Sequence, residues 1–152
     1  MSGRLAQMFR NPDWPQIESL LRRARTIAVV GLSDNPARPS HGVAAGMQRL
    51  GYRIIPVNPV AAASGETILG ETVYATLTDA ARHHTIDLVN VFRNSEDVPP
   101  VVDEALAIGA PAVWLQLGIR HEAQMQRAQA AGLMCVQDRC LKVEHARRMR
   151  SS

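Results

Sequence analysis

The residues with the clearest capacity for chemistry lie in the segment GLSDNPARPSHG, positions 31–42. Gly31 lets the backbone turn sharply and lets a phosphate approach closely. Ser33 offers a hydroxyl group, and Arg38 offers a guanidinium that can hold phosphate with two hydrogen bonds. Ser40 and His41 open the next predicted helix, where free N–H groups and the positive end of the helix dipole favour an anion. These residue types, in this order, predict a phosphate-binding loop.

The turn after the next apolar run bears on which nucleotide is bound. An NAD-binding unit has G-x-G-x-x-G spacing and an acidic residue near the end of its second strand, which binds the ribose hydroxyls. Here the first loop is longer than that spacing, and the second run ends in Val57-Asn58-Pro59. A neutral amide and a proline give no preference for the NAD ribose, so the sequence disfavours NAD.

Cys140 is a further position with possible chemistry, because it follows the last apolar run beside Asp138 and Arg139. A neighbouring arginine and a helix N-terminus lower the pKa of a thiol. Cys140 is therefore either a reactive thiol or a small residue that packs at a helix start. Cys135 lies within an apolar run and is expected in the core. The two cysteines have no C-x-x-C spacing, so we expect neither a metal site nor a disulfide framework.

Five apolar runs are predicted as the strands that position these residues, and they alternate with helical patterns. Such alternation predicts an α/β fold with a doubly wound, five-stranded parallel sheet. Ligands of such sheets bind beyond the carboxyl ends of the strands. The predicted strands cover 26–30, 52–57, 86–92, 112–117 and 133–137. The residues just past them are Gly31–Ser33, Asn58-Pro59, Phe92-Arg93, Gln116–Gly118 and Asp138–Cys140.

Four local predictions concern the segments between the strands. The small residues of Ala61–Gly70 favour an irregular loop, and Thr78 is expected to cap a short helix. Gly46 lies within a predicted helix over 43–50, where it costs about 1 kcal/mol relative to alanine, so we expect a strand to approach it closely. Glu144 and His145 on a terminal helix over 141–149 are interpreted as part of a surface face of salt bridges.

The 152 residues, 46% of them hydrophobic, suffice for a single domain. We expect residues 1–24 to form a helical extension packed on a domain over residues 25–152. No apolar run reaches the roughly 20 residues that cross a membrane, and the N-terminus lacks the apolar core of a signal peptide, so a cytoplasmic protein is expected. The net charge of +3 is too dispersed to argue for nucleic acid.

The chain resembles the small stand-alone CoA-binding proteins, which are similar to the CoA-binding domain of the succinyl-CoA synthetase alpha subunit. The resemblance covers about residues 25–145. It rests on TIAVVGLSDNPARPSHGVAAGMQRLGYRIIPVNP, ILGETVYATL, IDLVNVFR, AVWLQLGI and DRCLKVEH, in this order. It implies a Rossmann-like domain that binds coenzyme A or an acyl-CoA at the carboxyl ends of the strands.

The resemblance also implies which residues contact CoA. The adenosine diphosphate part would lie on the first loop, with Arg38 as the hypothetical partner of the 3′-phosphate. The synthetase has a threonine-glycine-rich first loop, whereas this chain has the longer segment Asp34–Pro39. The residues implied are Gly31, Ser33, Arg38, Ser40 and His41 for the phosphates; Asn58 and Pro59 beside the adenine and ribose; Phe92 and Arg93 where the pyrophosphate meets the pantetheine; and Gln116 and Gly118 in the fourth-strand turn.

The sequence leaves alternatives to a simple CoA binder. One is an enzyme, either an NAD(P)-dependent oxidoreductase or an acyl-CoA processing unit. The reactive interpretation of Cys140 is a thiol that exchanges with CoA or a CoA disulfide. Another is a CoA-sensing module that acts through a partner protein. No paired acid and base stands at the strand ends, so we expect a binder without catalysis. Whether the protein forms a homo-oligomer is left open.

Overall fold

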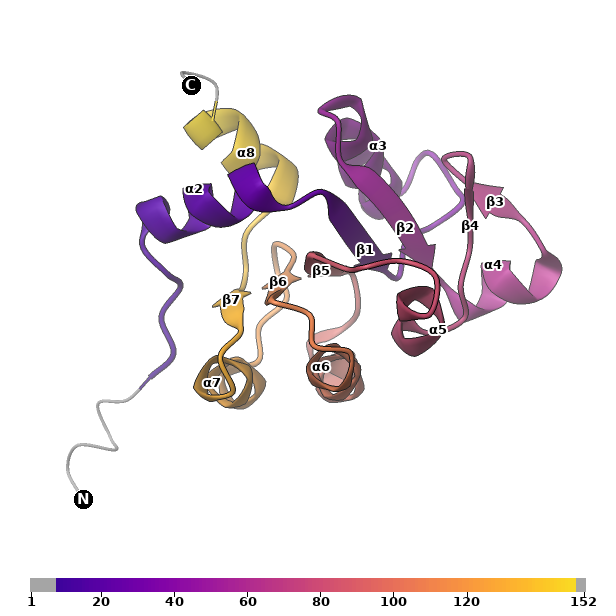
Figure 1. Ribbon diagram of the computed structural model, residues 1–152. Coiled ribbons are helices and arrows are strands. Elements are labelled where there is room, and N and C mark those ends of the chain that lie inside the picture. Colours follow the sequence, from indigo (N-terminus) through magenta and orange to yellow (C-terminus); the bar gives the residue numbers. More distant parts are fainter. Residues whose placement is uncertain (1–7, 150–152) are drawn as a thin grey trace.

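The computed structural model describes residues 8–149 and is built around a single five-stranded sheet (Figure 1). The strand order is β2-β1-β5-β6-β7, and every neighbouring pair is parallel. The strands are β1 (Thr26–Val30), β2 (Arg53–Val57), β5 (Leu88–Val91), β6 (Ala112–Leu115) and β7 (Met134–Val136). The predicted α/β fold with a doubly wound parallel sheet is confirmed.

Helices cover both faces of the sheet (Figure 1). One layer consists of α2 (Trp14–Arg23), α3 (Pro39–Arg49) and α8 (Leu141–Met149), and the other of α5 (Leu77–Ala81), α6 (Val98–Ala107) and α7 (Glu122–Ala130). Because side chains alternate along a strand, each strand contributes to both layers. In β1, Ile27 and Val29 pack under the first layer, whereas Ala28 and Val30 pack under the second. Buried strands of this kind explain the continuous apolar runs in the sequence.

The strand order reverses between β1 and β5. From β1 the chain passes through α3 to β2 on one side, and it then crosses to β5 on the other side of β1. At such a switch point the connections leave in opposite directions, which opens a crevice beyond the carboxyl ends of the two strands. The loop after β1 and the residues after β5 therefore form the first place to search for a site.

The segment Ala61–Gly70 is ordered, so the prediction of an irregular loop is wrong. It forms most of helix α4 (Pro59–Ser64) and of a hairpin between β3 (Thr67–Ile68) and β4 (Glu71–Thr72). Asn58 caps α4, since its Oδ1 accepts hydrogen bonds from the N–H groups of Val60 (3.0 Å) and Ala61 (3.2 Å). Ile68 is buried and anchors the hairpin to the core beneath the first helix layer.

Two further local predictions are wrong. Helix α5 is capped by Thr76 and not by Thr78, because the Thr76 Oγ1 accepts from the Asp79 N–H at 3.0 Å. The residue that crowds Gly46 belongs to a helix and not to a strand. A Cβ at position 46 would lie 2.7 Å from the Cε of Lys142 on α8, so glycine there lets α3 and α8 approach.

Glu144 is buried, at 7% exposure, so its predicted place at the surface is wrong, whereas its predicted salt bridges are present. Its Oε1 lies 3.8 Å from an Arg139 Nη and 3.6 Å from the Arg148 Nε. The guanidinium of Arg148 lies over the ring of Trp14, 5.2 Å from its centroid. These contacts connect α8 to α2, because Arg148 is paired with Glu144 and also lies over Trp14. The Glu144 carboxylate is therefore covered by these contacts.

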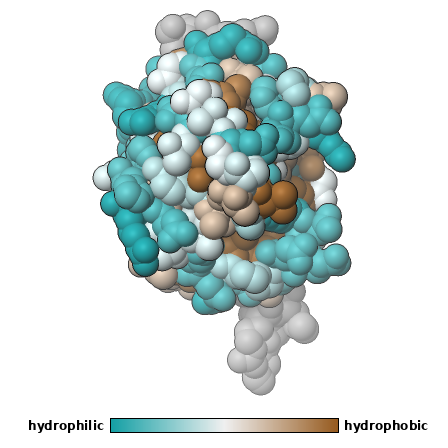
Figure 2. Space-filling view, turned by 90° about the vertical axis from the view of Figure 1, so that its right-hand side faces the viewer, coloured by the Kyte–Doolittle hydropathy of each residue, from teal (hydrophilic) through white to brown (hydrophobic). Residues whose placement is uncertain are grey.

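The predicted N-terminal extension is described from residue 8 onward, and residues 1–7 lie outside the described residues. Its helix α2 buries Ile17, Leu20 and Leu21 under the same layer as α3 and α8. Figure 2 shows the side of the molecule formed by α3, α4 and the hairpin, which is mostly hydrophilic around a small hydrophobic area. Among residues 8–149, no helix has the length and apolar character needed to span a membrane.

Candidate functional site at the carboxyl edge of the sheet

Gly31 occupies the position where β1 and β5 come closest at their carboxyl ends. Its N–H donates to the Val57 carbonyl (2.8 Å), and the Phe92 N–H donates to the Val30 carbonyl (2.8 Å), so strand pairing continues beyond the strands themselves. Gly31 has φ +90°, and a Cβ at this position would lie 2.1 Å from the Phe92 carbonyl oxygen. Only glycine fits, for reasons of both backbone conformation and space.

The loop after Gly31 is held in shape by its own polar groups. The Ser40 Oγ accepts from the Ser33 N–H (3.0 Å), and the Ser33 Oγ accepts from the Asn35 N–H (3.0 Å). The Asn35 Oδ1 accepts in turn from the Ala37 N–H (2.9 Å). Ser33 and Ser40 therefore position the loop, whatever further contacts they make. The loop is preorganised, which lowers the entropy cost of binding a ligand.

A hollow of about 370 Å³ lies over this loop and brings together most of the predicted phosphate-binding residues. Gly31, Ser33, Arg38, Ser40 and Phe92 line it, together with Pro39. Arg38 is the N-cap residue of α3, so its cation stands at the positive end of that helix. Within residues 8–149, its guanidinium makes no hydrogen bond or ion pair. Positive potential and an uncompensated guanidinium make this hollow suitable for an anion.

A second hollow, of about 820 Å³, begins on the other side of Phe92. It is lined by Phe92, Arg93, Asn94, Ser95, Glu96, Gly118 and Ile119. Arg93 makes no ion pair with any residue from 8 to 149, whereas Arg120 nearby is bonded to Asp138 (3.0 Å) and Glu122 (3.1 Å). Arg38 and Arg93 are thus two cations available for an anionic ligand, one in each hollow. Phe92 is half-buried and contributes to both.

The other predicted contact residues support these hollows without lining them. Asn58 uses its whole amide within the protein, since its Oδ1 caps α4 and its Nδ2 donates to the Leu32 carbonyl at 2.9 Å. Pro59 follows as the first residue of α4, and His41 lies in the first turn of α3. Gln116 is buried, at 6% exposure, beneath the strand ends. The amide of Asn58 therefore fixes the first loop to β2.

The comparison with protein families gives the identity of this arrangement. The model of the CoA binding domain matches residues 25–146, which is most of the chain. The chain belongs to this CoA-binding domain family. It is also 42% identical over 138 residues to an uncharacterized Bacillus subtilis protein, YneT, and the match covers 91% of this chain and 98% of that protein.

Solved structures agree with the family and the fold. The structure of cell-free ID.343 from Thermus thermophilus is 38% identical, has a TM-score of 0.83, and is matched over 90% of this chain and 98% of that one. A hypothetical protein from Pyrococcus horikoshii OT3 is 30% identical, with a TM-score of 0.82 and coverage of 93% and 97%. The apo dinucleotide-forming acetyl-coenzyme A synthetase 1 of Ca. Korarchaeum cryptofilum is 20% identical, with a TM-score of 0.64 and coverage of 78% and 28%, and shows the shared fold.

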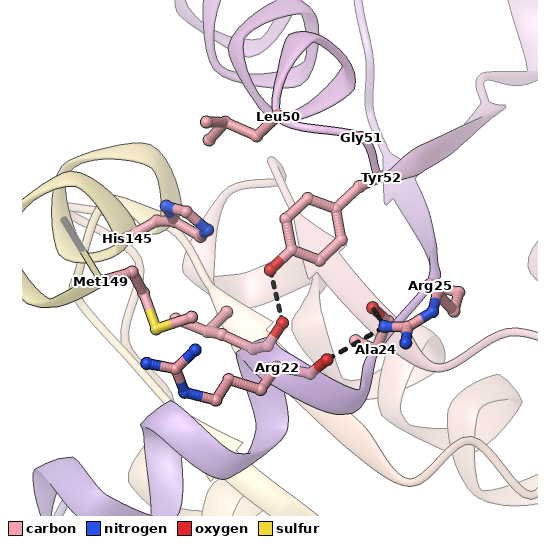
Figure 3. Close-up of a pocket in the computed structure, with 9 residues that line it drawn as sticks. Arg22, Ala24, Arg25, Leu50, Gly51, Tyr52, His145 and Met149 are labelled. Carbon is pink, nitrogen blue, oxygen red and sulfur yellow. Dashed lines mark hydrogen bonds between the residues drawn. The ribbon is translucent and has the colours of Figure 1, made fainter. Parts of the chain in front are cut away.

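The CoA-binding domain has another hollow, of about 360 Å³, at the amino edge of the sheet (Figure 3). Figure 3 shows Tyr52, His145, Leu50 and Met149 around it. The Tyr52 hydroxyl donates to the Leu21 carbonyl, and an Nη of Arg25 donates to the carbonyls at the end of α2. Two polar groups of its wall, those of Tyr52 and Arg25, are therefore engaged with the end of α2, and a third, Arg22, is paired with Glu18, which indicates a structural role.

A polar cluster at the ends of β6 and β7 was not predicted as a unit. Asp138 has φ +58° and accepts hydrogen bonds from the Gly118 N–H (2.8 Å) and from Arg120 (3.0 Å). The Gly118 N–H, followed by Arg120, holds the pKa of the Asp138 carboxyl below its usual range. A non-glycine residue rarely adopts a positive φ, and here these bonds offset the cost. The cluster shapes the Gly118 turn that lines the second hollow.

The two cysteines have different surroundings. Cys135 is fully buried in β7, as expected, and burial raises the pKa of its thiol to about 12. Cys140 is half-buried, immediately before α8, and lines neither of the carboxyl-edge hollows. The alternative of a reactive Cys140, whose thiolate would attack the disulfide of an oxidised CoA and release one CoA thiol, stays a hypothesis. Trp114 of β6 is buried, and its Nε1 donates to the Arg139 carbonyl at 2.8 Å, which fixes the backbone next to Cys140.

Proposed function

We propose that the protein binds coenzyme A or an acyl-CoA in the two hollows at the carboxyl edge of its sheet, and that it does so without catalysing a reaction. The observation that carries the proposal is the hollow over the first loop. There Gly31 permits close approach, and the uncompensated cation of Arg38 stands at the N-terminus of α3. The diphosphate would lie in this hollow, and the pantetheine arm would pass Phe92 towards Arg93 and Gly118.

The binding of NAD is disfavoured by the end of β2. Asn58 stands where a NAD-binding unit has its acidic residue, and both ends of its amide are engaged within the protein. Its Oδ1, the atom that could accept from a ribose hydroxyl as a carboxylate does, is already bonded to two backbone N–H groups. The family membership of the chain supports the same choice of ligand.

The proposal of a binder rests on how the titratable groups at the carboxyl edge are engaged. Asp138 is a candidate general base there, but it is held as an anion by Arg120 and the Gly118 N–H. A carboxylate stabilised in this way is a weak proton acceptor near neutral pH. The carboxyl edge is therefore better suited to holding a ligand than to moving a proton.

The test compares ligands that share parts of CoA. A ligand that binds the native state raises the midpoint of thermal unfolding by mass action. CoA, dephospho-CoA, acetyl-CoA, NAD and ATP would be added at matched concentrations, and we expect the largest increase with CoA or acetyl-CoA. An increase with NAD and none with CoA would reverse the proposal. Turnover of acetyl-CoA to free CoA by the protein alone would remove the statement that it lacks catalysis.

A further inference from the structure

Asn90 is a buried amide in the middle of β5, between the apolar residues Val89 and Val91. It is 1% exposed. Its Nδ2 donates to the Trp114 carbonyl (3.2 Å) and to the Gln116 Oε1 (3.3 Å). Its Oδ1 is buried and accepts no hydrogen bond from residues 8–149. A buried acceptor without a donor costs about 1–3 kcal/mol, so its retention calls for an explanation.

The geometry of the strands indicates where this oxygen points. Asn90 is in register with Val29 of β1 on one side and with Trp114 of β6 on the other. All three side chains lie on the face covered by α2, α3 and α8, because Val29 and Trp114 belong to that cluster. Both bonds of Nδ2 are directed towards β6, so Oδ1, at the opposite end of the amide, is directed towards β1. It therefore faces the switch point under the carboxyl-edge hollows.

Phe92 separates Asn90 from these hollows. It lies two residues beyond Asn90 on the same face, is half-buried, and lines both hollows. Asn90 itself lines neither hollow, so a ligand reaches its oxygen only if the Phe92 side chain moves, and that movement belongs to the proposed binding. Asn90 is thus the next residue on this face of β5 below the side chain that a ligand crossing between the hollows must pass.

Gln116 adds a donor next to this acceptor. Its Oε1 is engaged by the Asn90 Nδ2 and by the Leu141 N–H, each at 3.3 Å. Its Nε2 donates to no other group of residues 8–149. Asn90 and Gln116, whose amides are joined by a hydrogen bond of 3.3 Å, together therefore offer a ligand one acceptor and one donor. The phosphate groups of a nucleotide carry no donor at neutral pH, so they cannot satisfy Asn90. Secondary amides have both an N–H and a carbonyl.

We infer that Asn90 and Gln116 recognise the amide groups of the pantetheine arm, with an amide N–H donating to Asn90 Oδ1 and an amide carbonyl accepting from Gln116 Nε2. The inference rests on the proposed function and extends it, since it assigns the part of CoA that a nucleotide lacks to a named pair of side chains. If Asn90 bonds to the pantetheine arm, it favours CoA over a nucleotide that carries the same phosphates but no pantetheine.

The variant Asn90→Leu tests this selection, with binding measured by titration calorimetry. Leucine has roughly the shape of asparagine and removes both the Oδ1 acceptor and the Nδ2 donor, so the comparison with a ligand that lacks the pantetheine arm separates the loss of binding from the loss of internal bonds. CoA should bind about tenfold more weakly to the variant, the effect of losing one buried hydrogen bond, whereas adenosine 3′,5′-bisphosphate should bind as it does to the wild type. An unchanged CoA affinity, or equal losses for the two ligands, would overturn the inference. If the wild type binds no CoA at all, the proposed function itself fails, which is a different result.

Gln137→Met provides a matched control. Gln137 is buried at 3% exposure, but its amide is fully engaged, with Oε1 accepting from the His121 N–H and Nε2 donating to Glu122. Its loss should lower the unfolding midpoint and leave the ratio of the two affinities unchanged. A changed ratio would count against the assignment of selection to Asn90.

A measurement on the wild type excludes effects of folding. The side-chain N–H₂ resonances of Asn90 should shift when CoA is added, and they should stay in place with adenosine 3′,5′-bisphosphate. Shifts of equal size with both ligands, or with neither, would contradict the inference.

Discussion

The two edges of the sheet both carry hollows and arginines, but they differ in what those groups are bonded to. At the amino edge, Tyr52 and Arg25 are engaged with the last carbonyls of α2. At the carboxyl edge, Arg38 and Arg93 have no ion pair with any other residue from 8 to 149, and the Asn90 Oδ1 has no donor. These polar groups around the amino-edge hollow thus bond to the end of helix α2. The carboxyl-edge hollows instead have, within the described part of the chain, arginine side chains without an ion pair and lie above a buried oxygen without a hydrogen-bond donor. The unmet groups and the larger volume of the second hollow, about 820 Å³ against about 360 Å³ at the amino edge, both favour the carboxyl edge as the site.

The largest expected difference between the edges concerns two glycines with positive φ. Gly31→Ala should lower the free energy of unfolding by about 3 kcal/mol or more, because the added Cβ meets the Phe92 carbonyl oxygen at 2.1 Å in a strained backbone. Gly51→Ala, at the amino edge, has φ +103° but meets nothing within 4 Å, and should cost only about 1–2 kcal/mol. Denaturant unfolding measures both. Equal losses of unfolding free energy for the two variants would show that Gly31 is not in close contact with the Phe92 backbone.

The next comparison uses two arginines at opposite ends of α3. Arg38→Ala should weaken CoA binding by roughly tenfold, since a charged hydrogen bond to phosphate contributes about 1.5–3 kcal/mol. It should weaken dephospho-CoA less, if Arg38 holds the 3′-phosphate. Arg49→Ala removes the same charge from the last turn of α3 and should leave both affinities unchanged. Titration calorimetry gives the four values. Equal losses for the two ligands would refute the assignment to the 3′-phosphate but not the site.

At the amino edge, Tyr52→Phe should affect stability and not binding. It removes the hydroxyl that donates to the Leu21 carbonyl, which leaves a buried acceptor unpaired and should cost about 1 kcal/mol. The thermal shift produced by CoA should match that of the wild type. A smaller shift would mean that the amino edge takes part in binding.

The smallest expected effect concerns pH and His145. Burial lowers the pKa of His145 in the folded protein. Its ring packs edge-on against the ring of Tyr52, with 5.7 Å between the two ring centroids. The unfolded chain therefore binds the proton more readily, so stability is present above the unfolded pKa near 6.5 and decreases as the pH falls below it. The decrease should be under about 1 kcal/mol, because the ring is partly solvated. His145→Gln should flatten the unfolding free energy between about pH 7 and 5; an unchanged slope would assign the effect to another group, such as His84.

The strands were predictable because each is a continuous apolar run, a pattern that results from burial on both faces. The helix and hairpin over Ala61–Gly70 were missed because their stability comes from elsewhere. Helix α4 has six residues and depends on the cap from Asn58, and each hairpin strand has two residues, anchored through Ile68. Elements this short have no periodic pattern of their own.

The sequence also placed part of the candidate site. Gly31, Ser33, Arg38 and Ser40 are close in the sequence, and their types alone suggested a phosphate loop. Asn90 was missed, because an amide within IDLVNVF has no meaning until β5 and β6 are neighbours and Gln116 becomes its partner. An amide inside an otherwise apolar strand was the one signal that could have identified it.

The most direct test of the central claim is a titration of the wild-type protein with CoA, followed through the backbone amide resonances of glycines at the two edges. Gly31 and Gly118 lie at the carboxyl edge, and Gly51 and Gly109 precede β2 and β6 at the amino edge. The account predicts saturable shifts of Gly31 and Gly118, with Gly51 and Gly109 unchanged. Shifts confined to Gly51 and Gly109, or no shift at all, would contradict it.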